Sequence, residues 1–478
     1  MRSRIILLSV LVALIALAGP AVAQEKPNVV LVFMDNFGWG ELGVYGGGIL
    51  RGAPTPRIDT LASEGLRLLN FNVEAQCTPS RAALMTGRYA IRTGNGSIPI
   101  ESPLYGLTQW EYTMAEMFSD IGYATGMFGK WHLGHTEGRF PTDQGFDEWY
   151  GIPNSSDESA WPDDSRYRPD SHPFAHPEYV MEARKDGEPE KLKVYDTEAR
   201  ILIDDEVTNK SIDFMQRQVG AGKPFFLFIP YTQTHMPVLP HPEFAGSTGN
   251  GDFADVLAQT DAYVGRLLDE VDRLGIGDNT IFIFTSDNGP DPTLPHHSFP
   301  GPWGGSHFTG LEGSLRVPFI VRWPARIPAG GVSNEIVHEM DLFPTLAAIV
   351  GGRVPDDRII DGVDQSEFFS GEKEKSDRES FVVYVGNDIF GVKWRNWKMM
   401  MKELRQAFGE PTKEYPVPLI FDLHTDPREE HPLDPRWWKT GWVRWPAGQV
   451  LVDHVVSLKK EPPIRPGTQD PYEPTSGQ

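Results

Sequence analysis

Short apolar segments rich in valine, isoleucine and phenylalanine recur along this 478-residue chain, and they constrain its fold more than any other feature. Glycine, proline or aspartate bounds each segment, a pattern typical of strands buried on both faces of a parallel sheet. The four clearest segments are Asn28–Met34, Tyr123–Phe128, Pro224–Pro230 and Thr280–Thr285.

Helical patterns fill the intervals between these strands. Apolar residues recur there at helical spacing, and capping residues or glycines mark the ends. This alternation, from residue 28 to residue 350, predicts an α/β fold with a large, mostly parallel central sheet and helices on both faces. The expected helices are Pro56–Glu64, Trp110–Ile121, Asp204–Gln218, Phe253–Leu274 and Met340–Val350.

The C-terminal part has a different pattern, in which short strands follow one another with polar turns between them. Such a run predicts a small α+β subdomain with an antiparallel sheet. We therefore expect a large α/β domain over 24–375, a C-terminal subdomain over 376–460 and a loose, Pro-rich tail over 461–478. The expected strands of the subdomain are Ser380–Val385, Gly391–Trp394, Trp397–Lys402 and Leu419–Leu423.

The first 23 residues have the features of a signal peptide. A basic start precedes an apolar run, and Ala21-Val22-Ala23 supplies the small residues that a signal peptidase recognises. The run is too short for a spanning helix, so we expect cleavage and export to the periplasm or the medium, with no membrane span afterwards. The formal net charge of −22 argues against a nucleic-acid partner.

A single cysteine, Cys77, is unusual for an exported protein, because such proteins normally use cysteines in disulfide pairs. The cysteine precedes Thr78, a possible helix cap, and Pro79, which suits a first helical position. A helix N-terminus favours an anion, and Arg81 adds positive charge one turn later. Two interpretations of Cys77 are compatible with this position: a thiolate nucleophile and a small hydrophobic residue of the core.

Two acid–amide pairs follow predicted strands. Asp35-Asn36 comes after the first strand and Asp287-Asn288 after the fourth. Ligands gather at the carboxyl ends of parallel strands, so the two pairs are expected to converge. Their oxygens suit Ca²⁺ or Mg²⁺. Turn formation is the alternative explanation for either pair taken alone.

Seven segments resemble, in order, the type I sulfatases of the alkaline-phosphatase-like superfamily. The likeness extends from about Lys26 into the C-terminal subdomain and includes a Cys-x-Pro-x-Arg signature followed by Thr-Gly-Arg. The segments are PNVVLVFMDNFGWGELG, CTPSRAALMTGR, GKWHLG, GIPNSSD, THMP, TSDNG and LEGSLRVPFIVRWP.

The resemblance implies a role for each matching residue. Cys77 would be converted to formylglycine by a formylglycine-generating enzyme, and its hydrated aldehyde would be the nucleophile. Arg81 and Lys130 would bind the sulfate, with Ser155 as a hydroxyl donor, although Ser156 is adjacent. His235 would protonate the leaving group, and His132 would help to break the sulfated intermediate. The implied metal ligands are Asp35, Asn36, Cys77, Asp287 and Asn288.

Two positions depart from the family pattern. The family usually has aspartate where this chain has Asn36, so the metal shell loses one negative charge. It also usually has lysine where this chain has His307, which is shorter and only partly charged near neutral pH. We expect His307 to be a catalytic and substrate-binding residue nevertheless.

These features predict an arylsulfatase-like enzyme that hydrolyses the sulfate ester of a small molecule or carbohydrate. Two alternatives stay open: a phosphodiesterase or phosphonate monoester hydrolase of the same superfamily, and a binding paralogue with an impaired site. Trp39, Trp131 and Trp303 are candidates for stacking on a substrate ring, although packed tryptophans are commoner. His296 and His297 are further candidates for the border of the pocket.

Overall fold

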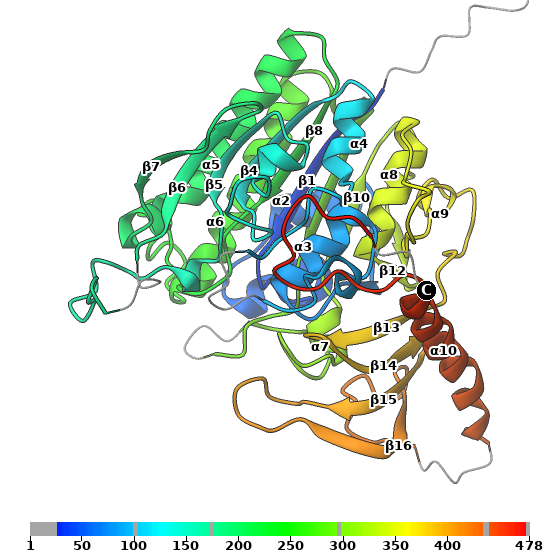
Figure 1. Ribbon diagram of the computed structural model, residues 1–478. Helices are drawn as coiled ribbons and strands as arrows, with labels where there is room; N and C mark the ends of the chain where they lie inside the picture. Colours follow the sequence, from blue (N-terminus) through cyan, green and yellow to red (C-terminus); the bar gives the residue numbers. More distant parts are fainter. Residues whose placement is uncertain (1–25, 99–103, 172–175, 294–297, 434–438, 475–478) are drawn as a thin grey trace, which may run out of the picture.

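The computed structural model describes residues 26–98, 104–171, 176–293, 298–433 and 439–474. Its largest element is a ten-stranded sheet in the order β11-β2-β10-β9-β1-β8-β4-β5-β6-β7 (Figure 1). The five strands in the middle are parallel. They are β9 (Thr280–Ser286), β1 (Asn28–Met34), β8 (Phe225–Pro230), β4 (Ala124–Lys130) and β5 (Glu148–Ile152).

Further strands extend this sheet at both sides, all through antiparallel pairs except β11, which pairs with β2 in parallel. On one side are β10 (Phe319–Arg322), β2 (Leu66–Leu68) and β11 (Gly331–Ser333), and on the other β6 (Tyr179–Arg184) and β7 (Glu190–Val194). The predicted mostly parallel sheet and all four predicted strands are confirmed. The edge strands were not predicted, because they are short or polar and lack the continuous apolar pattern.

Helices cover both faces of the sheet, as predicted. One face packs against α2 (Pro56–Ser63), α5 (Thr197–Gly220) and α6 (Asp252–Arg273). The other packs against α3 (Cys77–Thr86), α4 (Met114–Asp120) and α8 (Leu342–Val350). The expected helix from Trp110 begins only at Met114, because Thr113 and Glu116 form a capping box there.

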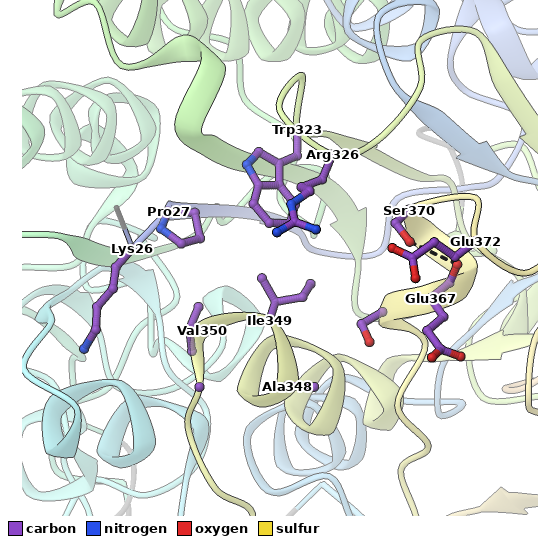
Figure 2. A pocket seen from close by; sticks show the side chains of 12 residues that line it. Lys26, Pro27, Trp323, Arg326, Ala348, Ile349, Val350, Glu367, Ser370 and Glu372 are labelled. Carbon is purple, nitrogen blue, oxygen red and sulfur yellow. Dashed lines mark hydrogen bonds between the residues drawn. The ribbon is translucent and has the colours of Figure 1, made fainter. Parts of the chain in front are cut away.

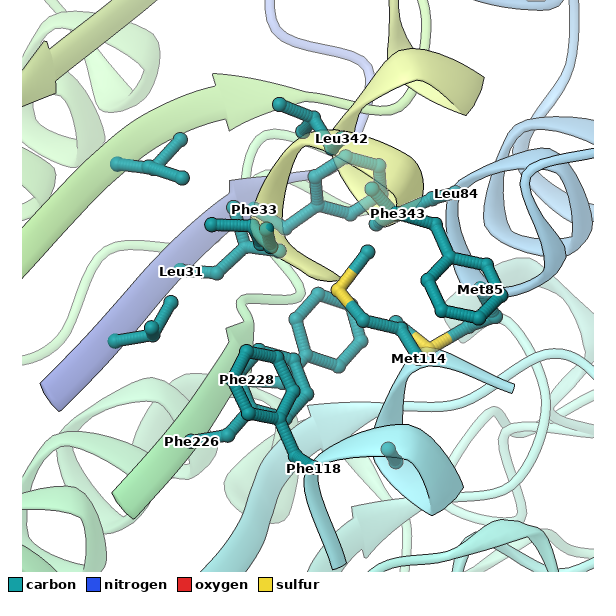
Figure 3. Close-up of a cluster of buried hydrophobic side chains, with 14 of the residues drawn as sticks. Leu31, Phe33, Leu84, Met85, Met114, Phe118, Phe226, Phe228, Leu342 and Phe343 are labelled. Atoms are coloured by element: carbon teal, nitrogen blue, oxygen red, sulfur yellow. The ribbon is translucent and has the colours of Figure 1, made fainter. Parts of the chain in front are cut away.

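Strand β1 shows why the sequence pattern was continuous. Val29, Leu31 and Phe33 point into one core, and the residues between them into the other. Both faces are therefore buried, and each position of the strand selects an apolar side chain. Figure 3 shows the core on the α3/α4/α8 side, where residues of β1 and β8 meet those helices. The labelled members are Leu31, Phe33, Leu84, Met85, Met114, Phe118, Phe226, Phe228, Leu342 and Phe343.

The C-terminal part forms a separate four-stranded antiparallel sheet, as predicted. Its strands pair in chain order, and α10 (Arg444–Lys460) packs beside them (Figure 1). The strands are β13 (Ser380–Val385), β14 (Asp388–Trp394), β15 (Trp397–Glu403) and β16 (Lys413–Asp422). The short helix α9 (Ser366–Phe369) lies in the connection to this sheet, whereas α7 (Glu312–Leu315) lies earlier, between β9 and β10 of the large sheet. The exact boundaries of the two units stay a prediction.

The segment expected to form a loose tail has neither helix nor strand in its described part, but it makes specific contacts with the large domain. Ile464 is 4% exposed, and its N–H donates to the Arg92 carbonyl at 2.9 Å. Arg139 donates to the Thr468 carbonyl and pairs with Asp470. A Pro-rich composition alone did not reveal these anchors.

Replacing Ile464 with alanine is expected to lower the free energy of unfolding by about 2–5 kcal/mol, because it removes a buried side chain from a packed site. Val456→Ala on α10 is the control, since Val456 is 57% exposed, and its effect is expected to stay within about 0.5 kcal/mol. Denaturant unfolding curves measure both values. Equal stability of the two variants would contradict the anchoring role of Ile464.

The expected signal peptide lies outside the described residues. Within the described ranges, none of the helices combines the length and apolar character needed to cross a membrane.

Candidate active site

The two acid–amide pairs converge at the carboxyl edge of the central strands. Strands β1 and β9 are parallel neighbours, with Met34 beside Ser286, so the residues that follow them come together. The Asn36 N–H donates to Asp287 Oδ1 at 3.1 Å. Asn36 has a left-handed φ of 56°, a conformation that asparagine tolerates better than most residues.

Two buried basic residues neutralise this acidic centre. Arg81 donates to Asp287 Oδ2 at 2.8 Å and lies 3.6 Å from Asp35 Oδ2. Lys130, the last residue of β4, donates to Asp35 Oδ2 at 2.7 Å. Although burial alone would raise the pKa of Asp35, Lys130, His235 and Arg81 hold that pKa well below its usual range. Burial and the neighbouring Asp35 raise the pKa of Asp287.

The arrangement of oxygen atoms fits a divalent cation. Asn288 Nδ2 donates to Asn36 Oδ1 at 2.6 Å. Among the described residues, Asp35 Oδ1 and Asn288 Oδ1 are buried acceptors without a hydrogen-bond donor. The possible metal-ligand atoms of Asp35, Cys77 and His235 lie within 4.8 Å of one another. A hard cation would satisfy these acceptors, so the residues present are suited to Ca²⁺ or Mg²⁺.

Cys77 is the first residue of α3 and is buried beside this centre. The helix begins there with extended Gln76 as its N-cap and without a side-chain cap, so the expected capping by Thr78 and helix start at Pro79 are wrong. Burial, with the charges of Asp35 and Asp287, raises the pKa of the Cys77 thiol.

A chain of hydrogen bonds leads from Lys130 to His235. Lys130 Nζ donates to Ser155 Oγ at 3.0 Å, and that hydroxyl lies 3.3 Å from His235 Nε2. Ser156 instead bonds the Tyr195 hydroxyl at 2.9 Å. Of the two adjacent serines, Ser155 therefore faces the cluster.

The remaining histidines occupy different environments. His132 Nε2 lies 3.1 Å from Glu158 Oε1, and burial lowers the pKa of His132. His307 is buried, and its Nε2 has no partner in the described part of the chain. Burial, with His235 and Lys130, lowers the pKa of His307 to about 3, so it is neutral at neutral pH. His296 and His297 lie outside the described residues.

Two acidic neighbours were missed by the sequence analysis. Asp157 lies 3.5 Å from His235 Nε2, and Glu158 pairs with His132. Both stand in a polar turn directly after Ser155 and Ser156, where acidic residues usually face solvent.

The three tryptophans predicted as candidates for ring stacking have different environments. Trp131 is a core residue that donates to the Arg139 carbonyl at 2.9 Å, whereas Trp39 and Trp303 are half-buried and contact each other.

The geometry brings all eleven predicted site residues to one edge of the sheet or to the loops beside it. A sequence model of the sulfatase family matches residues 27–352, most of the chain. The chain belongs to the sulfatase family. Residues 308–434 match the C-terminal model of N-sulphoglucosamine sulphohydrolase.

Named relatives agree with this membership. Dog (Canis lupus familiaris) N-acetylgalactosamine-6-sulfatase is 35% identical over 87% of this chain and 83% of its own length. Human arylsulfatase A is 34% identical over 88% of this chain and 86% of its own. The crystal structure of the PsFucS1 sulfatase from Pseudoalteromonas sp. has a TM-score of 0.86, with 31% identity over 92% of each chain. The protein is therefore a sulfuric ester hydrolase with the alkaline-phosphatase-like fold.

Proposed function

We propose that this sulfatase removes sulfate from a sulfated sugar, with formylglycine made from Cys77 and a bound Ca²⁺ or Mg²⁺. The observation that carries the proposal is the placement of the only cysteine. Cys77 begins a helix within 4.8 Å of the donor atoms of Asp35 and His235, and it is surrounded by Arg81 and Lys130. Relatives named as sugar sulfatases support the substrate class.

The proposed cation ligands are Asp35, Asn288, Asp287, Asn36 and residue 77. Asp35 and Asn288 each offer a buried oxygen without a donor, while Asn36 Oδ1 accepts from Asn288 and orients it. When present, the hydrated aldehyde supplies the nucleophile and the cation supplies positive charge at the sulfate oxygens. Asn36 in place of the usual aspartate leaves this centre one negative charge poorer.

Arg81 and Lys130 bind the sulfate in this proposal. Both are buried, and both retain N–H donors beyond their bonds to Asp287 and Asp35. A preorganised cation in a water-poor site stabilises charge that develops in the transition state. Ser155 holds Lys130 in position and adds a hydroxyl at the same edge.

Two histidines have separate proton-transfer roles in this proposal, one at the leaving group and one at the nucleophile. His235 Nε2 faces Ser155 and Asp157, and we assign it the protonation of the leaving ester oxygen. His132 would accept a proton from the aldehyde hydrate: burial lowers the pKa of His132, which keeps the ring unprotonated, and Glu158 holds the ring in place. His307 is neutral, so it takes a hydrogen-bonding role where the family pattern has a cation.

Export and maturation belong to the same proposal. Residues 1–23 have signal-peptide features, and a formylglycine-generating enzyme would modify Cys77 before the enzyme acts in the periplasm or the medium.

Mass spectrometry of the peptide that contains residue 77, combined with turnover assays, tests the proposal. Protein from a conversion-competent host is expected to carry the aldehyde and to release sulfate from 6-sulfated N-acetylgalactosamine. An intact thiol in fully active enzyme would reject formylglycine. Faster turnover of aryl phosphate or phosphonate esters would favour the phosphorus-ester alternative. Fully converted protein that hydrolyses none of these esters would favour a binding paralogue.

Removal of the cation by a chelator is expected to lower kcat/KM by about 100-fold or more, because two buried acceptors and the reacting sulfate lose their counter-charge. Calcium or magnesium is expected to restore activity and to raise the Tm, because a ligand that binds only the folded state stabilises it. Calorimetry with and without Ca²⁺ measures this stabilisation independently of activity. The same titration on Asp35→Asn is expected to give a smaller shift; equal shifts would exclude Asp35 as a ligand.

A further inference from the structure

A groove of about 720 Å³ opens beside the catalytic centre, where the loop after β9 faces the turn between β15 and β16. Its walls come from segments that are far apart in the sequence. Its volume is in the range of pockets that bind small ligands. The larger side chains in its walls are Arg51, Phe299, Trp303, Arg405, Phe408 and Arg428.

This groove is basic although the chain has a formal net charge of −22. Among the described residues that line it, three are arginines and none is aspartate or glutamate. Their carboxylate partners lie outside the lining: Glu41 for Arg51, Glu403 for Arg405 and Glu430 for Arg428. Arg428 is 58% exposed and pairs with Glu430 through Nε, so its terminal N–H groups suit an anion.

Exposed apolar rings stand beside these charges. Phe408 is 73% exposed and Phe299 is 38% exposed, although side chains of this kind are normally buried. Apolar surface beside oriented charged donors is typical of a site that binds a ring bearing an anionic group.

The groove lies next to the proposed active site, because neighbouring residues of one loop line the groove and belong to the site. Ser306 lines the groove and directly precedes His307. The Phe308 ring lies 5.4 Å from the Phe408 ring, between centroids. On the other side Thr293, a lining residue, donates its hydroxyl to Asp291, and the same oxygen lies 2.8 Å from the sulfur of Met236, the neighbour of His235. One lining residue of the groove is therefore adjacent to His307 in the chain, and another contacts the residue next to His235.

The wall of the groove is fixed to the loop after β1. The Gly40 N–H donates to the Phe299 carbonyl at 3.0 Å. A Cβ atom on Gly38 would lie 2.3 Å from the same carbonyl oxygen, so only glycine permits this approach. The groove is therefore anchored to the segment that carries Asp35.

A second pocket, of about 410 Å³, has different properties (Figure 2). It lies at the other end of β1, where Lys26 and Pro27 precede the strand, and is therefore remote from Asp35. Both signs of charge line it: Lys26 and Arg326 are basic, and Glu367 and Glu372 are acidic. Of these two pockets, the groove near His307 is the one lined by basic residues without acidic ones, as an anionic ligand requires.

We propose that the groove binds the sugar next to the sulfated one and recognises an anionic group on it, a carboxylate or a second sulfate. The inference rests on the proposed sugar sulfatase function and makes it more specific. The preferred substrate is then an anionic oligosaccharide, with Arg428 and Arg405 contacting the neighbouring anion and Phe408 contacting its ring.

Binding to the inactive Cys77→Ala enzyme tests the groove without turnover. The probe is a disaccharide of 6-sulfated N-acetylgalactosamine linked to glucuronate, and its matched control is the uronate methyl ester, which lacks that charge. Calorimetry is expected to show about tenfold or greater weakening on methylation. Adding Arg428→Ala is expected to weaken the acid form similarly and to abolish the effect of methylation, while Arg428→Lys keeps part of it. A third probe, with a sulfated neutral sugar in place of glucuronate, distinguishes carboxylate from sulfate recognition.

The control variant is Arg166→Ala, because Arg166 is 88% exposed and pairs with Asp164 away from the groove lining. It is expected to bind every probe as its parent does. Equal dissociation constants for the acid, the methyl ester and the sulfated-sugar probe with and without Arg428 would overturn the groove proposal. If the charge effect is present but converted wild-type enzyme releases no sulfate from the disaccharide, the groove stands and the proposed function falls.

Discussion

Cys77→Ala is expected to lower kcat for sulfate ester hydrolysis by about 10⁴-fold or more, because the substitution removes the only precursor of the proposed nucleophile. Arg81 and Lys130 stay in place, so sulfate binding is expected to survive. Initial rates on a chromogenic aryl sulfate and on the sulfated monosaccharide measure the loss. The effect is expected in kcat much more than in KM.

The fold is expected to tolerate this change, because alanine occupies the same helical position without a larger volume. Circular dichroism and a thermal melt check that point. Cys77→Ser is the informative comparison: a single hydroxyl can be sulfated but cannot expel sulfate by reforming an aldehyde. It is expected to release at most one equivalent of alcohol per enzyme. Multiple turnovers by Cys77→Ala would eliminate residue 77 as the nucleophile.

The predictable parts of this molecule are those in which local pattern and burial coincide. Strand β1 buries both faces, so its sequence is continuously apolar and its bounds match the prediction. The convergence of Asp35 and Asp287 follows from the parallel pairing of β1 and β9, because parallel neighbours end at one edge. Fold class and the centre of the site were therefore accessible from sequence.

The remaining parts depend on contacts between distant segments. Nothing local distinguishes Glu158, which pairs with His132, from an acidic residue of a solvent-exposed turn. His307 Nε2 lacks a hydrogen-bond partner because segments distant in the sequence bury the ring. The basic groove exists only because the fold brings Arg51 and Arg428, which are hundreds of residues apart in the sequence, to the same cavity. Such features need the fold first.

A buried ionic cluster joins the two parts of the fold, and Glu312 is its centre. Glu312 belongs to α7, which lies beside the C-terminal sheet (Figure 1). Its carboxylate accepts from Lys393 at 2.6 Å and from Lys398 at 3.1 Å, and it pairs with Arg316. Although burial alone would raise the pKa of Glu312, the basic groups hold it far below its usual range. The carboxylate is therefore ionised in the folded protein.

Glu312→Gln is expected to lower the free energy of unfolding by about 3–5 kcal/mol, because glutamine has nearly the same shape but leaves buried cations without their counter-charge. Activity is also expected to fall, since Glu312 follows His307 by five residues in the same connection between β9 and β10. The matched control is Glu367→Gln, in an exposed pair with Lys373. That change is expected to cost at most about 1 kcal/mol. Denaturant unfolding and kcat/KM provide the two readouts.

A double-mutant cycle with Lys393 separates the ionic contact from simple loss of packing. Lys393 Nζ also bonds the side chains of Asn70 and Asn72, but its carboxylate partner is Glu312. Lys393→Met in the Glu312→Gln background removes the stranded charge, so the double variant is expected to lose about 1–3 kcal/mol less than the sum of the single losses. Strict additivity would mean that these side chains act independently. The buried Glu312–Lys393 pair would then contribute nothing to holding the large sheet and the C-terminal sheet together.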